Sequence, residues 1–150
     1  MPASTALQYH MSGIQYRMAH LAIVVSPVFE AQRDTIMLPS LEIAGFAYEN
    51  FLKVMLVKDR VKESDFAYGK NGHDLLKLLQ LSEQAGRNYD HLNLRNYVAF
   101  ISEYHSNYSL RYTSEHITYR HPHPEPLQEN LTALQNFTQQ FVDYPPLLED

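Results

Sequence analysis

The sequence predicts an all-α fold, an antiparallel up-and-down bundle of four to five helices. Apolar residues recur at spacings of three and four along most of the chain, which is the period of an amphipathic helix. Only five of the 150 residues are glycine, and no stretch alternates long enough between apolar and polar residues to suggest a sheet. The length suits one domain, and there is no internal repeat, so we expect a single helical domain over residues 1–150.

The N-terminal half is expected to contain two long helices with a short helical piece between them. Ser26 can cap a helix and Pro27 suits a first helical position, so the first helix should end near residue 25. A short helical piece follows over residues 27–37, and the central helix is expected over residues 39–59. The apolar stripe of the first helix comprises Leu7, Met11, Ile14, Met18, Leu21 and Val25.

The C-terminal half is expected to contain three helices. The first covers residues 73–85 and is ended by Gly86, a favoured residue after a helix. Asp90 should cap the next helix, which starts near residue 91, and a proline-rich break precedes the last helix at residues 127–142. The apolar stripes of these helices and of the central one predict a buried core. The residues that we expect to be largely buried in this core are Ala44, Phe51, Leu75, Leu79, Ile101, Leu134 and Phe137.

Composition excludes several classes of function. The chain has no cysteine, so it has neither a disulfide framework nor a thiolate metal site. Its net charge is −5 and no basic stripe is evident, so any contact with RNA must be local. The longest apolar run, residues 21–25, is far shorter than the roughly 20 residues that cross a bilayer. We therefore expect a cytoplasmic protein without a membrane partner.

Two segments and one short motif carry a resemblance to a known family. Residues 38–53 are an apolar stretch with Glu49 and Lys53 near its far end, and residues 68–79 are a glycine loop that enters Gly-His-Asp-Leu and a leucine-rich helix. With Arg111-x4-His116 after the fourth helix, this order resembles the HEPN family of small helical bundles over most of the chain. The resemblance implies a homodimer with both motifs in one cleft, and either a metal-independent endoribonuclease or a non-catalytic module.

Arg111 and His116 are the candidate catalytic residues. RNA cleavage without metal uses the 2′-hydroxyl as nucleophile, and a histidine can move the protons while an arginine holds the phosphate oxygens. Chance alone supplies about one such spacing in a chain of this composition. Tyr112 also departs from the Asn or Asp that catalytic HEPN members commonly place after the arginine. In this respect the chain resembles HEPN members without demonstrated catalysis, which would bind a nucleotide or a protein such as a nucleotidyltransferase. A third hypothesis is a helical bundle that binds an unrelated ligand.

Glu49 and Lys53 have two interpretations. Their spacing and order favour an exposed ion pair on a helix. In HEPN proteins a glutamate at this point often faces inward near the signature arginine. The resemblance therefore implies that Glu49, and Tyr112 next to Arg111, are possible accessory polar residues of the site. His73 and Asp74 start a helix, where we expect capping and loop packing.

The remaining histidines and tyrosines are weaker candidates. The spacing of His105, His116, His121 and His123 is poor for metal ligation, so no metal site and no cofactor is expected. Tyrosines recur at rough helical spacing in the fourth helix and beyond it. Such residues stack on bases or pack in a core or dimer contact. Because the HEPN family that the chain resembles pairs there, and tyrosine is favoured at interfaces, we expect this helix to contribute to a two-fold interface. The tyrosines of this series are Tyr97, Tyr104, Tyr108, Tyr112 and Tyr119.

Overall fold

The computed structural model describes residues 4–67, 72–105 and 124–144, and these residues form helices and turns without a strand. The predicted all-α bundle is thereby confirmed. Five long helices and one short helix follow one another in the described part of the chain, with two short 3₁₀ helices between them. They are α1 (Thr5–Val24), α2 (Pro27–Ala31), α3 (Arg33–Lys58), η1 (Glu63–Asp65), α4 (Leu75–Gln84), η3 (Asp90–Leu92), α5 (Leu94–His105) and α6 (Pro124–Gln139).

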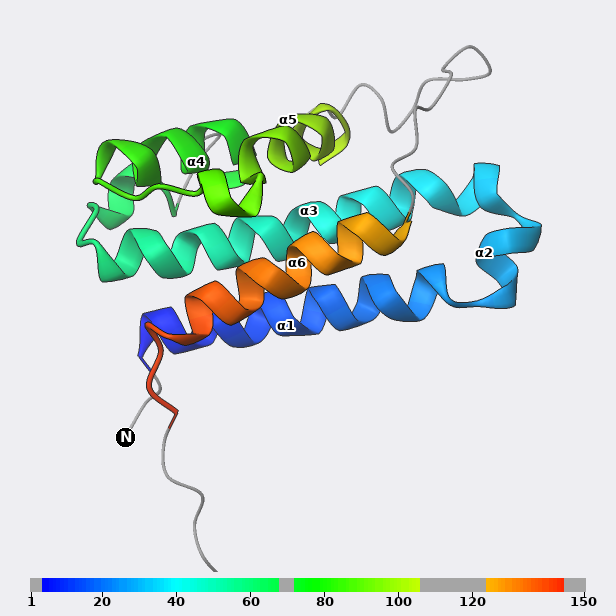
Figure 1. Cartoon of the computed structure of the whole chain (residues 1–150), viewed down its shortest axis with the longest axis horizontal. Helices are drawn as coiled ribbons and strands as arrows, with labels where there is room; N and C mark the ends of the chain where they lie inside the picture. Colours follow the sequence, from blue (N-terminus) through cyan, green and yellow to red (C-terminus); the bar gives the residue numbers. More distant parts are fainter. Residues whose placement is uncertain (1–3, 68–71, 106–123, 145–150) are drawn as a thin grey trace, which may run out of the picture.

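Helix α3 is the centre of the bundle and packs against α1, α2, α4, α5 and α6. Figure 1 shows α1 and α3 side by side in opposite directions, with α6 along them and with α4 and α5 on the other side of α3. Residues 47–56 are therefore buried without interruption. A helix surrounded in this way is expected to be apolar all round, yet this stretch also carries Glu49, Asn50 and Lys53 into the interior.

Helix α3 begins six residues earlier than the sequence predicts. It starts at Arg33 and continues through Pro39, whereas a separate short piece and a start at Pro39 were expected. Proline inside a helix removes one backbone hydrogen bond. The hydroxyl of Ser40 donates to the carbonyl oxygen of Met37 at 2.6 Å, and Met37 and Leu41 are buried on either side of the proline. Packing of this turn thus outweighs the local preference for a break.

The buried face of α1 keeps only part of the predicted apolar stripe, since Leu7 is buried. Met11, Met18 and Val25 are 46%, 48% and 69% exposed. Polar or small residues are buried instead, and they satisfy their polar groups on α6: the His10 ring bonds to the side chains of Thr138 and Gln139. Counting apolar residues alone overlooks such a face. Its members are Ala6, Leu7, His10, Gly13 and His20.

The close approach of α1 and α3 depends on Gly13. A Cβ atom at this position would lie 2.6 Å from the ring of Phe51, which is fully buried. Such a distance is well below van der Waals contact, so a larger side chain would push the two helices apart. The glycine therefore sets the spacing at the middle of the helix pair.

The two ends of α4 follow the turn chemistry of the sequence closely. Asp74 is the N-cap of α4 and its carboxylate accepts from the Lys77 amide at 3.1 Å, as expected for this residue type. Gly86 follows α4 with a positive φ of 106°, which confirms its predicted role. The fourth helix does not start directly at residue 91, because Asn93 adopts a left-handed conformation between η3 and α5.

The predicted core is confirmed except at one position. Ala44, Phe51, Leu75, Leu79, Ile101 and Leu134 are all buried. Phe137 is only partly buried, and its ring packs against those of Tyr89, His91 and Phe141. Among the described helices, none combines the length and the apolar character that crossing a membrane requires.

Candidate functional site

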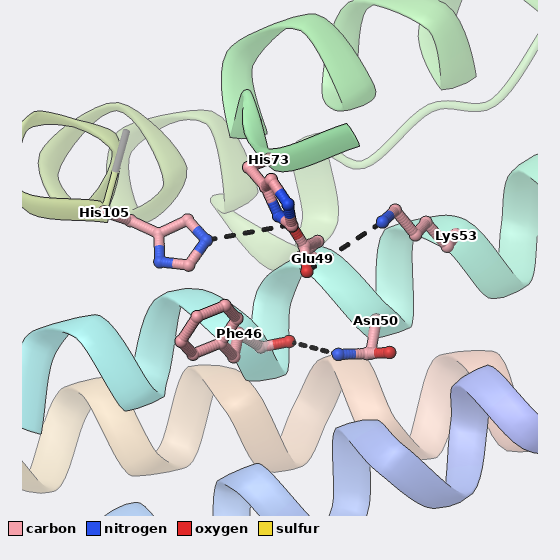
Figure 2. Close-up of polar contacts among 6 residues, drawn as sticks. All are labelled: Phe46, Glu49, Asn50, Lys53, His73 and His105. Carbon is pink, nitrogen blue, oxygen red and sulfur yellow. Dashed lines mark hydrogen bonds and ion pairs between the residues drawn. The ribbon is translucent and has the colours of Figure 1, made fainter. Parts of the chain in front are cut away.

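Four polar side chains meet inside the bundle, and we call them the Glu49 cluster: Glu49, Lys53, His73 and His105. Glu49 and Lys53 lie one turn apart on α3. His73 directly precedes the N-cap of α4, and His105 is the last residue of α5. Figure 2 shows the two imidazole rings and the Lys53 side chain converging on the Glu49 carboxylate. Three separate parts of the chain therefore build one site.

The two oxygens of Glu49 face different partners. Oε1 lies 2.6 Å from Nδ1 of His73, a hydrogen bond, and 3.8 Å from Nε2 of His105. Oε2 faces Nζ of Lys53 at 3.9 Å. One oxygen of the carboxylate is thus shared by two histidines, while the other faces an ammonium group.

Three members of the cluster are buried, and only His73 is exposed to solvent. The side chains of Glu49 and Lys53 are 6% and 8% exposed, whereas that of His73 is 53% exposed. A buried carboxylate is costly unless it is paired and hydrogen-bonded, so the surrounding groups are needed to hold it. The interpretation of Glu49 and Lys53 as an exposed surface pair is therefore wrong, and the inward orientation holds.

The surroundings determine the charge of the two α3 residues. Burial by itself raises the pKa of the Glu49 carboxyl, but His105, Lys53 and His73 together outweigh it and leave this pKa below its ordinary value. Burial lowers the pKa of Lys53, and the charge of Glu49 offsets this only in part. The carboxylate is accordingly held ionised at neutral pH, next to a lysine whose charge is disfavoured.

The His105 ring packs against Gly45, where the absence of a side chain leaves room for it. Its ring packs edge-on against Phe46, with centroids 4.6 Å apart, and a Cβ atom on Gly45 would lie 2.4 Å from the ring. Neither ring nitrogen makes a hydrogen bond to any residue that the structure describes. A buried polar group without a hydrogen bond costs about 1–3 kcal/mol. Its Nε2 instead makes a longer ion-pair approach to Oε1 of Glu49, at 3.8 Å.

The candidate catalytic residues Arg111 and His116 and the accessory Tyr112 lie outside the described residues, as do Tyr108, Tyr119, His121 and His123.

Sequence reasoning found Glu49 as an accessory residue but missed the meeting of His73 and His105 with it. One signal was present, since Glu49 and Lys53 interrupt the apolar stretch of the central helix at positions one turn apart. Nothing in the sequence joins His105 to Glu49, because the contact depends on how α5 packs on α3. Comparisons of the chain with protein-family models, with curated proteins and with solved structures gave no significant match.

Proposed function

We propose that this chain is a HEPN-type module of a prokaryotic stress or defence system, located in the cytoplasm, that cleaves RNA without a metal. The Glu49 cluster carries the proposal. It keeps an ionised carboxylate inside the bundle at the end of α5, directly before the segment that contains Arg111 and His116. Buried titratable groups with shifted pKa values gather at functional sites more often than elsewhere.

In the proposed reaction, the 2′-oxygen of a ribose forms a bond to the adjacent phosphorus and the bond from phosphorus to the 5′-oxygen breaks. The products are a 2′,3′-cyclic phosphate and a 5′-hydroxyl. His116 moves the proton from the 2′-hydroxyl to the leaving oxygen, and Arg111 stabilises the charge that builds on the phosphate oxygens. Glu49 orients the Arg111 guanidinium through a charge-assisted contact, and Tyr112 is an accessory contact to the substrate.

The test is cleavage of single-stranded RNA by the purified full chain in excess chelator. We expect products that end in a 2′,3′-cyclic phosphate. Arg111→Ala and His116→Ala should each slow cleavage by at least about a hundredfold, the lower range for losing a proton-transfer or charge-stabilising group. Arg120→Ala and His121→Ala are matched controls from the same stretch of chain and should cleave at the rate of the unmodified protein.

The alternative function, a non-catalytic HEPN bundle, makes a different prediction in the same experiment. Cleavage that survives both Arg111→Ala and His116→Ala would assign the activity to a contaminant or another site. An absence of cleavage, together with saturable binding of a nucleotide or of a nucleotidyltransferase partner that Arg111→Ala abolishes, would select the binding module. Tyr112 favours this alternative, because it stands where catalytic HEPN members commonly have Asn or Asp.

We also propose that the module is a homodimer, because the family it resembles pairs two copies of the motif in one cleft. Light scattering should then give twice the chain mass of 17.4 kDa. Tyr104 is buried within the chain, so α5 would contribute its more accessible side, which includes Tyr97 and Phe100. Arg95→Glu and Glu103→Arg reverse charges on the exposed face of α5 and should weaken a dimer formed there. A monomer at high protein concentration would contradict the composite cleft.

A further inference from the structure

Three members of the Glu49 cluster are residue types that bind transition metals. Glu49, His73 and His105 each offer one ligand atom, and these atoms all lie within 4.8 Å of one another. They come from α3, from the residue before the N-cap of α4 and from the end of α5, so only the folded bundle brings them together. A set of two histidines and one carboxylate is typical of catalytic zinc sites and of mononuclear iron sites.

The separations are close to those of a bound ion. Zinc binds nitrogen and carboxylate oxygen at about 2.0–2.2 Å, so two ligand atoms in a tetrahedral site lie roughly 3.3 Å apart. The distances from Glu49 Oε1, 2.6 Å to His73 Nδ1 and 3.8 Å to His105 Nε2, lie on either side of that value. The ligand atoms of the two histidines lie within 4.8 Å of each other, so an ion between the three atoms would also require the two rings to approach.

His105 supplies a second, independent observation. Its Nε2 faces the Glu49 carboxylate at ion-pair distance (Figure 2). Its side chain is 1% exposed, and neither of its ring nitrogens has a hydrogen-bond partner in the described part of the chain. Coordination of a metal would satisfy the nitrogen that faces the cluster. Gly45 keeps the ring in this position, because any Cβ atom there would clash with it.

We propose that Glu49, His73 and His105 form a binding site for a first-row divalent transition metal, of which zinc is the best match. Imidazole nitrogens exclude magnesium and calcium as the preferred ions, since these favour ligand sets made of oxygen. The exposed edge of His73 gives the ion a path from solvent. Three protein ligands leave the fourth position of a tetrahedral zinc site open for water or another small ligand.

Lys53 determines how tightly such a site binds. Its ammonium group faces Oε2, the oxygen of Glu49 that points away from the histidines, so it does not occupy the ion's place. Its positive charge nevertheless opposes a cation nearby. Removing the charge should therefore strengthen metal binding, whereas removing a ligand should weaken it.

Glu49 also orients Arg111 in the proposed cleavage, but metal binding is tested separately from RNA cleavage, because its readout is binding alone. The full chain is freed of metal by dialysis against a chelator and titrated with Zn²⁺ by calorimetry. We expect one ion per chain. Titration with Co²⁺ should give the visible absorption of a four-coordinate site with nitrogen and oxygen ligands.

The variants separate this site from adventitious binding by other histidines. His73→Ala lies on the surface and should fold normally, and it should weaken Zn²⁺ binding by at least tenfold, as should His105→Asn. Lys53→Met should tighten binding, and the matched His121→Ala/His123→Ala double variant should bind like the unmodified chain. Circular dichroism checks the fold of each. An unmodified chain that binds no Zn²⁺, or binding that survives His73→Ala but is lost in the double variant, would overturn the proposal.

Discussion

Replacing Phe51 by alanine should lower the free energy of unfolding by about 3–5 kcal/mol, the range found when a buried aromatic side chain is truncated. Phe51 lies in the C-terminal half of α3 and is fully buried. Its ring fills the space opposite Gly13 and packs edge-on against His10, with centroids 5.7 Å apart. Neither partner can move in to close the cavity, because glycine has no side chain and His10 is held by Thr138 and Gln139.

Urea unfolding followed by circular dichroism measures this loss, provided that the slope of the transition is the same in both proteins. Phe141→Ala is the matched control, since Phe141 is an aromatic residue after α6 that is only partly buried. Its truncation should cost clearly less. A loss below about 1 kcal/mol for Phe51→Ala would show that the packing of α1 on α3 is wrong.

The second large effect is a loss of stability of about 3 kcal/mol between pH 7 and pH 4, caused by His20. Burial lowers the pKa of His20 from 6.5 to about 4. In this pH range the unfolded chain takes up a proton on this ring while the folded chain does not, so stability falls as the pH falls below 6.5. A difference of about 2.5 pKa units corresponds to roughly 3 kcal/mol. The loss is complete once the pH drops below the folded pKa.

The pKa shifts of His10 and Glu49 also lower the stability of the folded chain at acidic pH. Burial also lowers the pKa of His10, although its bond to Gln139 offsets part of this. The pKa of Glu49 is lowered, so its contribution is present above the ordinary pKa of glutamate and is lost as the pH falls through its folded value. Stability should therefore continue to fall below pH 4.

A comparison of variants isolates the contribution of His20. His20→Asn keeps a polar side chain that can contact Gln128, the present partner of the ring, but it cannot titrate. Urea unfolding at pH 7 and at pH 4 should show a smaller difference for this variant than for the unmodified chain, by about 3 kcal/mol. His91→Asn, at an exposed position, should keep the original difference. Equal pH dependence in all three proteins would show that His20 titrates normally.

Periodicity predicted the fold well where the apolar residues themselves form the buried face. This holds for α4, α5 and α6, where Leu75, Ile101 and Leu134 are buried as expected. It failed on α1, because that helix buries His10 and His20 and exposes Met11 and Met18. Whether a histidine can be buried depends on partners such as Gln128 and Thr138 on α6, and no local pattern contains them.

Of the candidate site, only Glu49 and Lys53 could be predicted from the sequence. A glutamate and a lysine one turn apart within an apolar helix indicate a polar site or a surface pair, and only the packing around α3 decides that Glu49 faces inward. The contribution of His73 was hidden because the same segment also caps α4 through Asp74. Arg111 and His116 remain predictions, since they lie outside the described residues.

The central place of α3 has a consequence for how the molecule unfolds. Both layers of the bundle, α1 with α6 on one side and α4 with α5 on the other, bury their apolar faces against this one helix. Neither layer has a separate core, so neither can melt while the other remains intact. A ligand or substitution that acts on one side of α3 therefore changes the unfolding equilibrium of the whole described bundle, in a single cooperative transition.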